Sequence, residues 1–138
     1  MVSKQLLNTI LEYASKQAYP DIHLNTWFSP KVRDRNGDIN DLNNIIIQKN
    51  IINESWEEKV IEEEIQMPIL TSDIVKEIII AIIWENWFEN FELMMELDTS
   101  YSLKSWERYR VNCYIDSAWY SVAFRIIPSK IPTIEELW

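Results

Sequence analysis

Apolar and polar side chains alternate strictly over two neighbouring stretches near the end of the chain. Every second residue from Arg108 to Ile115 is apolar, and the pattern repeats from Ala118 to Ile126. This is the period of half-buried strands, and Asp116-Ser117 between them is the expected two-residue turn. The pattern predicts a β-hairpin with one apolar face and one face that carries arginines.

Two other stretches repeat with the helical period. Apolar residues at positions 6, 7, 10, 11 and 14 predict an amphipathic helix that begins near Ser3 and ends at about Lys16, before Pro20. A second apolar stripe, from Ile74 to Ile83, predicts a helix over about 74–84, with cap candidates at 71–73. The aromatic residues at 87, 88 and 91 continue this stripe loosely, and core packing explains them better than a cofactor box does.

The remaining patterned stretches indicate strands. We expect them over about Asp21–Phe28, Lys31–Ile39 with an Asn36-Gly37 turn, Asn44–Gln48, Glu57–Gln66 and Leu93–Leu103. The predicted order is a helix, two strands, a variable strand pair, a helix and three antiparallel strands. This order is typical of an α+β fold in which helices pack on one face of an antiparallel sheet.

Composition limits the class of protein. The 138 residues, 47% of them hydrophobic, are enough for one domain with one core. A formal charge of −9 argues against non-specific nucleic-acid binding. The start of the chain lacks a secretion signal, and the longest apolar run, Ile78 to Trp84, is too short to span a membrane. The lone Cys113 is expected to be a buried structural thiol in a reduced setting.

Candidate catalytic residues are few. The single glycine, Gly37, excludes the phosphate-binding loops Gly-x-x-x-x-Gly-Lys-Ser/Thr and Gly-x-Gly-x-x-Gly. His23 is the only histidine, and no serine or cysteine lies in a hydrolytic motif. The carboxylates at 21, 34 and 38 have no fixed separation, and the glutamates between 54 and 64 are better explained as a solvated face than as cation ligands. We therefore expect no catalytic residue, no metal site and no enzymatic activity in this chain alone.

Ordered motifs at both ends of the chain resemble one family. They are Tyr19-Pro-Asp21-Ile-His-Leu24, Arg33-Asp-Arg-Asn-Gly37-Asp-Ile39, Glu96-Leu-Asp-Thr-Ser-Tyr101, Arg108-Tyr-Arg-Val-Asn112 and Phe124-Arg-Ile-Ile-Pro128 followed by Ile134-Glu-Glu-Leu137. In this order they resemble the N-terminal domain of type IV pilus retraction ATPases, the PilT-like branch of the secretion ATPases. Pro20 stands where the family has serine, and the family has a single arginine three residues before the glycine.

The resemblance implies a PAS-like fold for residues 1–138, with an insertion at about 43–67 and without the P-loop motor domain that follows in the family. It implies that a motor domain holds ATP with Mg²⁺. It also implies that Arg33 or Arg35, together with Arg108 and Arg110, faces the phosphates of this ATP. Strand alternation does not decide between Arg33 and Arg35. The alternative is that these arginines pair with some of the many carboxylates.

The function implied is that of the N-terminal domain of a hexameric ATPase that powers pilus retraction, twitching motility or secretion. Its expected partners are motor domains of the same and neighbouring subunits and an inner-membrane platform protein, with no nucleic acid and no membrane insertion. The expected location is cytoplasmic, peripheral to the inner membrane. The alternative function is a standalone acidic PAS-like adaptor, or a sensor, that binds a protein partner.

Overall fold

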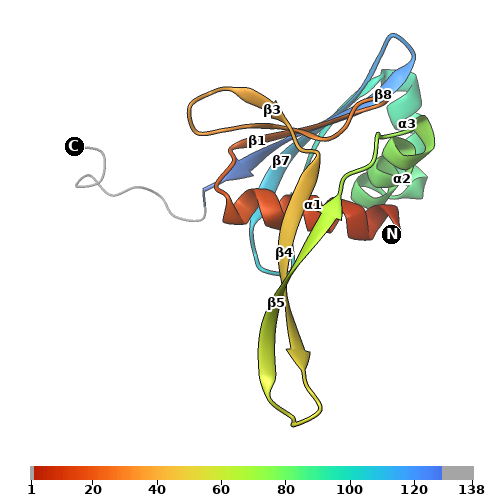
Figure 1. Cartoon of the computed structure of the whole chain (residues 1–138). Helices are drawn as coiled ribbons and strands as arrows, with labels where there is room; N and C mark the ends of the chain where they lie inside the picture. Colours follow the sequence, from red (N-terminus) through yellow and green to blue (C-terminus); the bar gives the residue numbers. More distant parts are fainter. Residues whose placement is uncertain (1, 129–138) are drawn as a thin grey trace, which may run out of the picture.

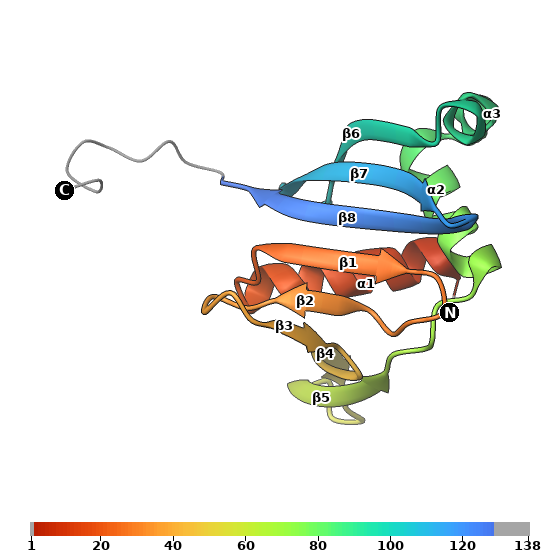
Figure 2. The same ribbon diagram turned by 90° about the horizontal axis from the view of Figure 1, so that it is seen from above.

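An antiparallel sheet of six strands forms the centre of the molecule. The computed structural model describes residues 2–128, and the Ile134–Leu137 motif lies outside them. The sheet order is β3-β2-β1-β8-β7-β6, and each neighbouring pair is antiparallel (Figure 1, Figure 2). Its strands are β1 Asp21–Asn25, β2 Lys31–Arg33, β3 Ile39–Asp41, β6 Glu96–Ser102, β7 Arg108–Asp116 and β8 Trp119–Ile127.

Two helices, α1 (Ser3–Lys16) and α2 (Ser72–Ile83), cover one face of this sheet (Figure 2). The apolar sides of both helices are buried against alternate strand residues, including Ile22, Val122 and Phe124. The hydroxyl of the buried Tyr109 donates to the carbonyl oxygen of Leu11 at 2.9 Å, so its polar atom is satisfied inside the core. The predicted α+β class, an antiparallel sheet with helices on one face, is confirmed.

The expected second helix is two helices. Thr71 caps α2 by accepting a hydrogen bond from the Ile74 amide at 3.3 Å, which confirms the predicted start. At Trp84 the backbone leaves the helical region, with φ 71° and ψ 151°, and α3 (Glu85–Met94) follows. The prediction that a strand begins at Leu93 is wrong, because α3 continues until Met95 takes a left-handed conformation and ends it.

The turn between β7 and β8 also differs from the prediction. Asp116 is paired with Trp119, and the two turn residues are Ser117 and Ala118, with φ values of 50° and 71°. Positive φ at both positions is the signature of a type I′ turn, which matches the twist of the flanking strands. The turn lies one residue later than predicted, but the two faces of the hairpin are as predicted, since alternation along each strand is preserved.

A separate two-stranded sheet is formed by β4 (Asn44–Ile52) and β5 (Glu58–Gln66). Both predicted strands are confirmed, although β4 is longer than expected. Ile45 at the base of this hairpin is fully buried in the core, whereas the far end projects away from the body of the molecule (Figure 1). None of the helices described is long and apolar enough to span a membrane.

Candidate functional site

The strand register aligns four charged side chains in one row across the sheet. Asp21 on β1 is paired with Arg33 on β2 and with Arg125 on β8, and Arg125 is paired with Arg110 on β7. Their chain neighbours, among them Ile22 and Phe124, point into the core. Because side chains alternate along a strand, the row lies on the face opposite the helices. We call Arg33, Asp21, Arg125 and Arg110 the charged row.

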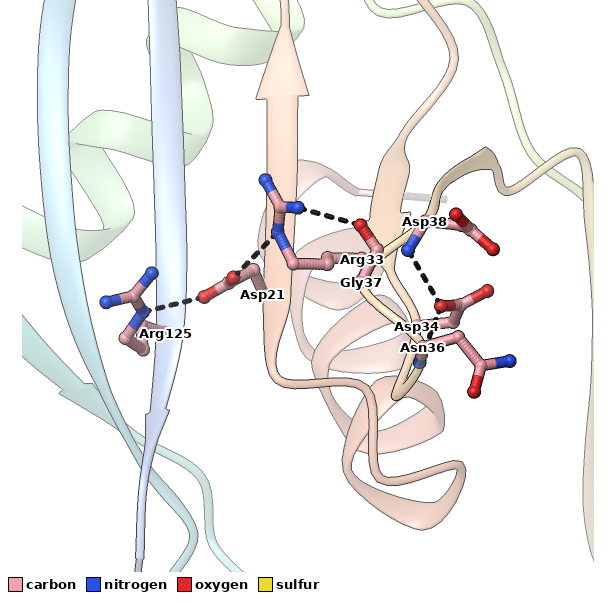
Figure 3. Close-up of polar contacts among 7 residues, drawn as sticks. All are labelled: Asp21, Arg33, Asp34, Asn36, Gly37, Asp38 and Arg125. Atoms are coloured by element: carbon pink, nitrogen blue, oxygen red, sulfur yellow. Dashed lines mark hydrogen bonds and ion pairs between the residues drawn. The ribbon is translucent and has the colours of Figure 1, made fainter.

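Asp21 holds two of the arginines in place. The Nε of Arg125 donates a hydrogen bond to its Oδ1 at 2.8 Å, and the Nε of Arg33 forms an ion pair with its Oδ2 at 3.2 Å (Figure 3). Only 10% of the Asp21 side chain is exposed, against 39% for Arg33 and 71% for Arg125. Each guanidinium therefore uses its inner nitrogen for Asp21, which orients the group and leaves outer N–H groups available as donors, apart from Arg33 Nη1.

The turn after β2 fixes Arg33 from the other side. Arg33 Nη1 donates to the carbonyl oxygen of Gly37 at 2.8 Å (Figure 3). Asp34 Oδ1 accepts from the amides of Asn36 and Asp38, both at 2.9 Å, and Gly37 has φ +89°, where a side chain would be strained. The predicted Asn36-Gly37 turn is confirmed, and it helps to position the arginine that precedes it.

A shallow depression of ≈ 280 Å³ lies over the charged row. Its polar lining adds His23, Asp98, Thr99 and Asn112 to the four residues of the row. Asn112 donates to Asp98, which lines the depression, at 2.8 Å and to Glu96, which does not, at 3.1 Å. Burial lowers the pKa of His23, and Arg33 and Arg125 lower it further against the opposing effect of Asp21. With a neutral imidazole, the charged lining is three arginines against Asp21 and Asp98, a small excess of positive charge that suits an anion.

The structure separates the four arginines that the sequence singled out. Arg33 and Arg110 line the depression, while Arg35 and Arg108 are not among its lining residues. Arg35 lies in the turn, where its Nη2 is 3.5 Å from the carbonyl oxygen of Gln17. Arg108 is exposed two residues before Arg110 on β7. Within residues 2–128, neither Arg108 nor Arg110 forms an ion pair with a carboxylate.

Sequence reasoning did not select Arg125. Its alternation with Phe124 placed it on the polar face of the hairpin, but only the pairing of β8 with β1 brings it to Asp21. The long sequence separation of these two residues left no local signal. Cys113 is fully buried as predicted, and burial raises its pKa to about 12. Across residues 2–128 no cluster of histidine, cysteine or acidic side chains could hold a metal ion.

No protein-family model matches the chain. A curated relative, the type IV pilus retraction ATPase PilT of Pseudomonas aeruginosa, is 27% identical over 131 residues, which are 95% of this chain and 31% of PilT. The chain thus spans about a third of the length of this relative.

Two solved structures share the fold. The crystal structure of the pilus retraction motor PilT with bound ADP matches with a TM-score of 0.68 and 20% identity, covering 93% of this chain and 31% of that one. The X-ray structure of the Legionella pneumophila ATPase DotB matches with a TM-score of 0.66 and 18% identity, covering 94% and 31%. Sequence and fold together confirm the expected relationship: this chain is homologous to the N-terminal part of PilT-like ATPases.

Proposed function

We propose that this chain works as the N-terminal domain of a hexameric PilT-like ATPase that powers pilus retraction or secretion. In this proposal residues 1–138 form one domain, and the β4–β5 hairpin is an insertion into it. The charged row faces the phosphates of a nucleotide that a motor domain holds. The observation that carries the proposal is the row itself, in which one nearly buried aspartate orients two arginines beside a third.

Phosphate is the ligand that this arrangement suits. Arginine keeps its charge at all working pH values, and its planar fork matches two phosphate oxygens. Asp21 and Asp98 together offset two of the three positive charges of Arg33, Arg110 and Arg125 in the lining of the depression. A polyanion placed over the depression would therefore gain charge-assisted hydrogen bonds without the entropic cost of ordering Arg33 and Arg125, since Asp21 already holds them.

The four arginines named in the sequence analysis have different roles in this proposal. Arg33 and Arg110 contact the phosphates together with Arg125, whereas Arg35 and Arg108 contribute only to the surrounding positive potential. The sequence contains one glycine and hence no P-loop, so another polypeptide segment must bind ATP and Mg²⁺ and supply the chemistry. The proposed partners are motor domains of the same and neighbouring subunits and an inner-membrane platform protein, at the cytoplasmic side of that membrane.

The test is the steady-state ATP turnover of the protein that the whole gene encodes. If the gene continues beyond Trp138 into a Gly-x-x-x-x-Gly-Lys-Ser/Thr stretch, the encoded protein should lose turnover when Arg33, Arg110 or Arg125 is replaced by alanine. Arg108→Ala is the matched control, because Arg108 lies on the same strand face as Arg110 but outside the depression. Unchanged turnover in all three row variants would reject the phosphate-facing role.

A second candidate is a standalone acidic adaptor that docks on a protein partner. The net charge of −9 and the projecting hairpin favour it. A stop codon directly after Trp138 would support the adaptor and exclude a motor on the same polypeptide.

A further inference from the structure

The distal half of the β4–β5 hairpin exposes apolar side chains that contact little of the described molecule. Ile52 is 62% exposed and Val60 is 63% exposed, whereas Ile45 at the base is buried. Nine paired residues extend over about 30 Å, and a hairpin of two strands without a third is only marginally stable in water. An arm of this length reaches beyond the surface of its own domain, as Figure 1 shows.

The tip of the hairpin carries a tryptophan where glycine would fit better. Trp56 has φ 60° and is 85% exposed. Its amide donates to the Asn53 carbonyl at 3.0 Å, which repeats the turn where the Gly37 amide donates to the Asp34 carbonyl at 3.0 Å. Gly37 has a left-handed conformation in that equivalent position. A bulky residue at positive φ is strained, and a ring in solvent gains no packing within the domain, so the indole at the tip is free to contact a partner.

The turn itself is built without the indole ring. Asn53 Oδ1 accepts from the Ser55 amide at 2.9 Å and from the Glu57 amide at 2.8 Å. These bonds close the loop whatever side chain stands at position 56. Residue 56 can therefore be changed without losing the hairpin.

Charge restricts what the arm can bind. Between residues 44 and 66 there are six glutamates and two lysines, and Glu54, Glu57 and Glu58 surround Trp56 at the tip. Two such tips repel one another, so direct pairing of two arms is disfavoured. The tip needs an apolar depression bordered by cationic side chains.

The opposite edge of the domain offers such an acceptor. A groove of ≈ 570 Å³ lies between α1, α2 and β6, and its lining includes Lys4, Glu12, Ile80, Trp84, Tyr101 and Lys104. The charged lining residues of the groove are thus two lysines and one glutamate, beside apolar side chains. The two lysines form no ion pair within residues 2–128. In the sheet order β6 is one outer strand, while the arm follows directly from β3, the other outer strand (Figure 2).

We propose that the hairpin tip of one copy docks into the α1–α2–β6 groove of the next copy. Trp56 fills the apolar part of the groove, and the glutamates of the tip pair with Lys4 and Lys104. Because tip and groove are different surfaces at opposite edges, the contact is head to tail, the type that closes into a ring or continues as a chain of copies. The contact does not involve the charged row, so it stands or fails separately from nucleotide binding.

Mixing two complementary variants tests the proposal. Trp56→Gly keeps the groove but lacks the tip side chain, and its positive φ suits glycine. The double variant Lys4→Glu with Lys104→Glu keeps the tip but reverses the charge of the groove at two exposed positions. Isotope-labelled Trp56→Gly protein is titrated with the unlabelled double variant, and amide shifts are followed at low and high salt.

The expected result is saturable shifts at Lys4, Tyr101 and Lys104 that weaken as salt rises. An unlabelled chain with all three changes should bind at least about thirtyfold more weakly, the size expected for a hot-spot tryptophan. Trp87→Ala is the control, since Trp87 is an exposed tryptophan on α3 outside both the tip and the groove and should leave self-association unchanged in sedimentation. No groove shifts at about 1 mM protein, or shifts at the charged row instead, would overturn the proposal.

Discussion

Arg110 and Arg125 are direct partners across β7 and β8, so two guanidinium groups lie side by side on the open face of the sheet. Like charges in directly opposed positions destabilise an antiparallel pair. Asp21 forms an ion pair with Arg125 and with Arg33 but not with Arg110. Arg110 therefore lies beside a second cation without an ion pair of its own within residues 2–128, and a bound anion would offset this repulsion.

Removing one charge of this pair should stabilise the free domain. We expect Arg110→Gln to raise the free energy of unfolding by about 0.2–1 kcal/mol at low salt, the range measured for cross-strand pairs. Urea denaturation measures the change. Arg108→Gln is the control, because Arg108 is paired with Ile127 and Ser102 and faces no second cation. A loss of stability in Arg110→Gln would contradict the idea that the two arginines repel each other.

Replacing Asp21 should have the opposite effect. Asp21→Asn removes the ion pairs with Arg33 and Arg125, one of them also a hydrogen bond, and leaves three neighbouring arginines without a carboxylate in the row. We expect a loss of about 1–2 kcal/mol, since both arginines are partly exposed and solvent screens part of the interaction. The exposed pair of Lys31 and Asp41 supplies the control: Asp41→Asn should cost less than about 0.5 kcal/mol. Equal costs for the two variants in urea denaturation would show that Asp21 has no special role.

His23 should make stability depend on pH between neutrality and mild acid. Burial lowers its pKa below the ordinary 6.5, so the folded chain keeps the imidazole neutral where the unfolded chain already binds a proton. This contribution is fully present above about pH 6.5 and is lost as the pH falls through that value towards the lowered pKa. His23→Gln should remove this loss between pH 7.5 and 5.5, measured by urea denaturation. An identical pH dependence in wild type and variant would contradict it.

Cys113 should be inert in the folded protein. Burial raises the pKa of its thiol to about 12 from 9.0, which reduces the thiolate fraction roughly a thousandfold, and the side chain is not exposed. Iodoacetamide at pH 8 should label it slowly in the native state and readily in denaturant, as read by mass spectrometry. Rapid labelling without denaturant would show that β7 opens more easily than its place between β6 and β8 suggests.

The periodic patterns gave the larger elements because each depends on local chemistry. Neighbouring residues determine the apolar stripe of α1, the alternation in β7 and β8, and the Asn36-Gly37 turn. The predictions were wrong where tertiary packing, rather than local sequence, determines the backbone conformation. A helix break at Trp84 and a turn at Ser117-Ala118 both require positive φ in residues that do not favour it, so no propensity predicts them.

The sequence by itself determined the α+β class, the faces of the strands, the absence of a P-loop and, through ordered motifs, the relationship to PilT-like ATPases. Only the tertiary structure decided which arginines meet. Asp21 and Arg125 come together because β8 adds to β1 across the middle of the sheet, and Arg35 is excluded because the turn carries it away. Alternation fixes the face on which a side chain lies, but strand order and register fix its neighbours, and these depend on contacts between distant parts of the chain.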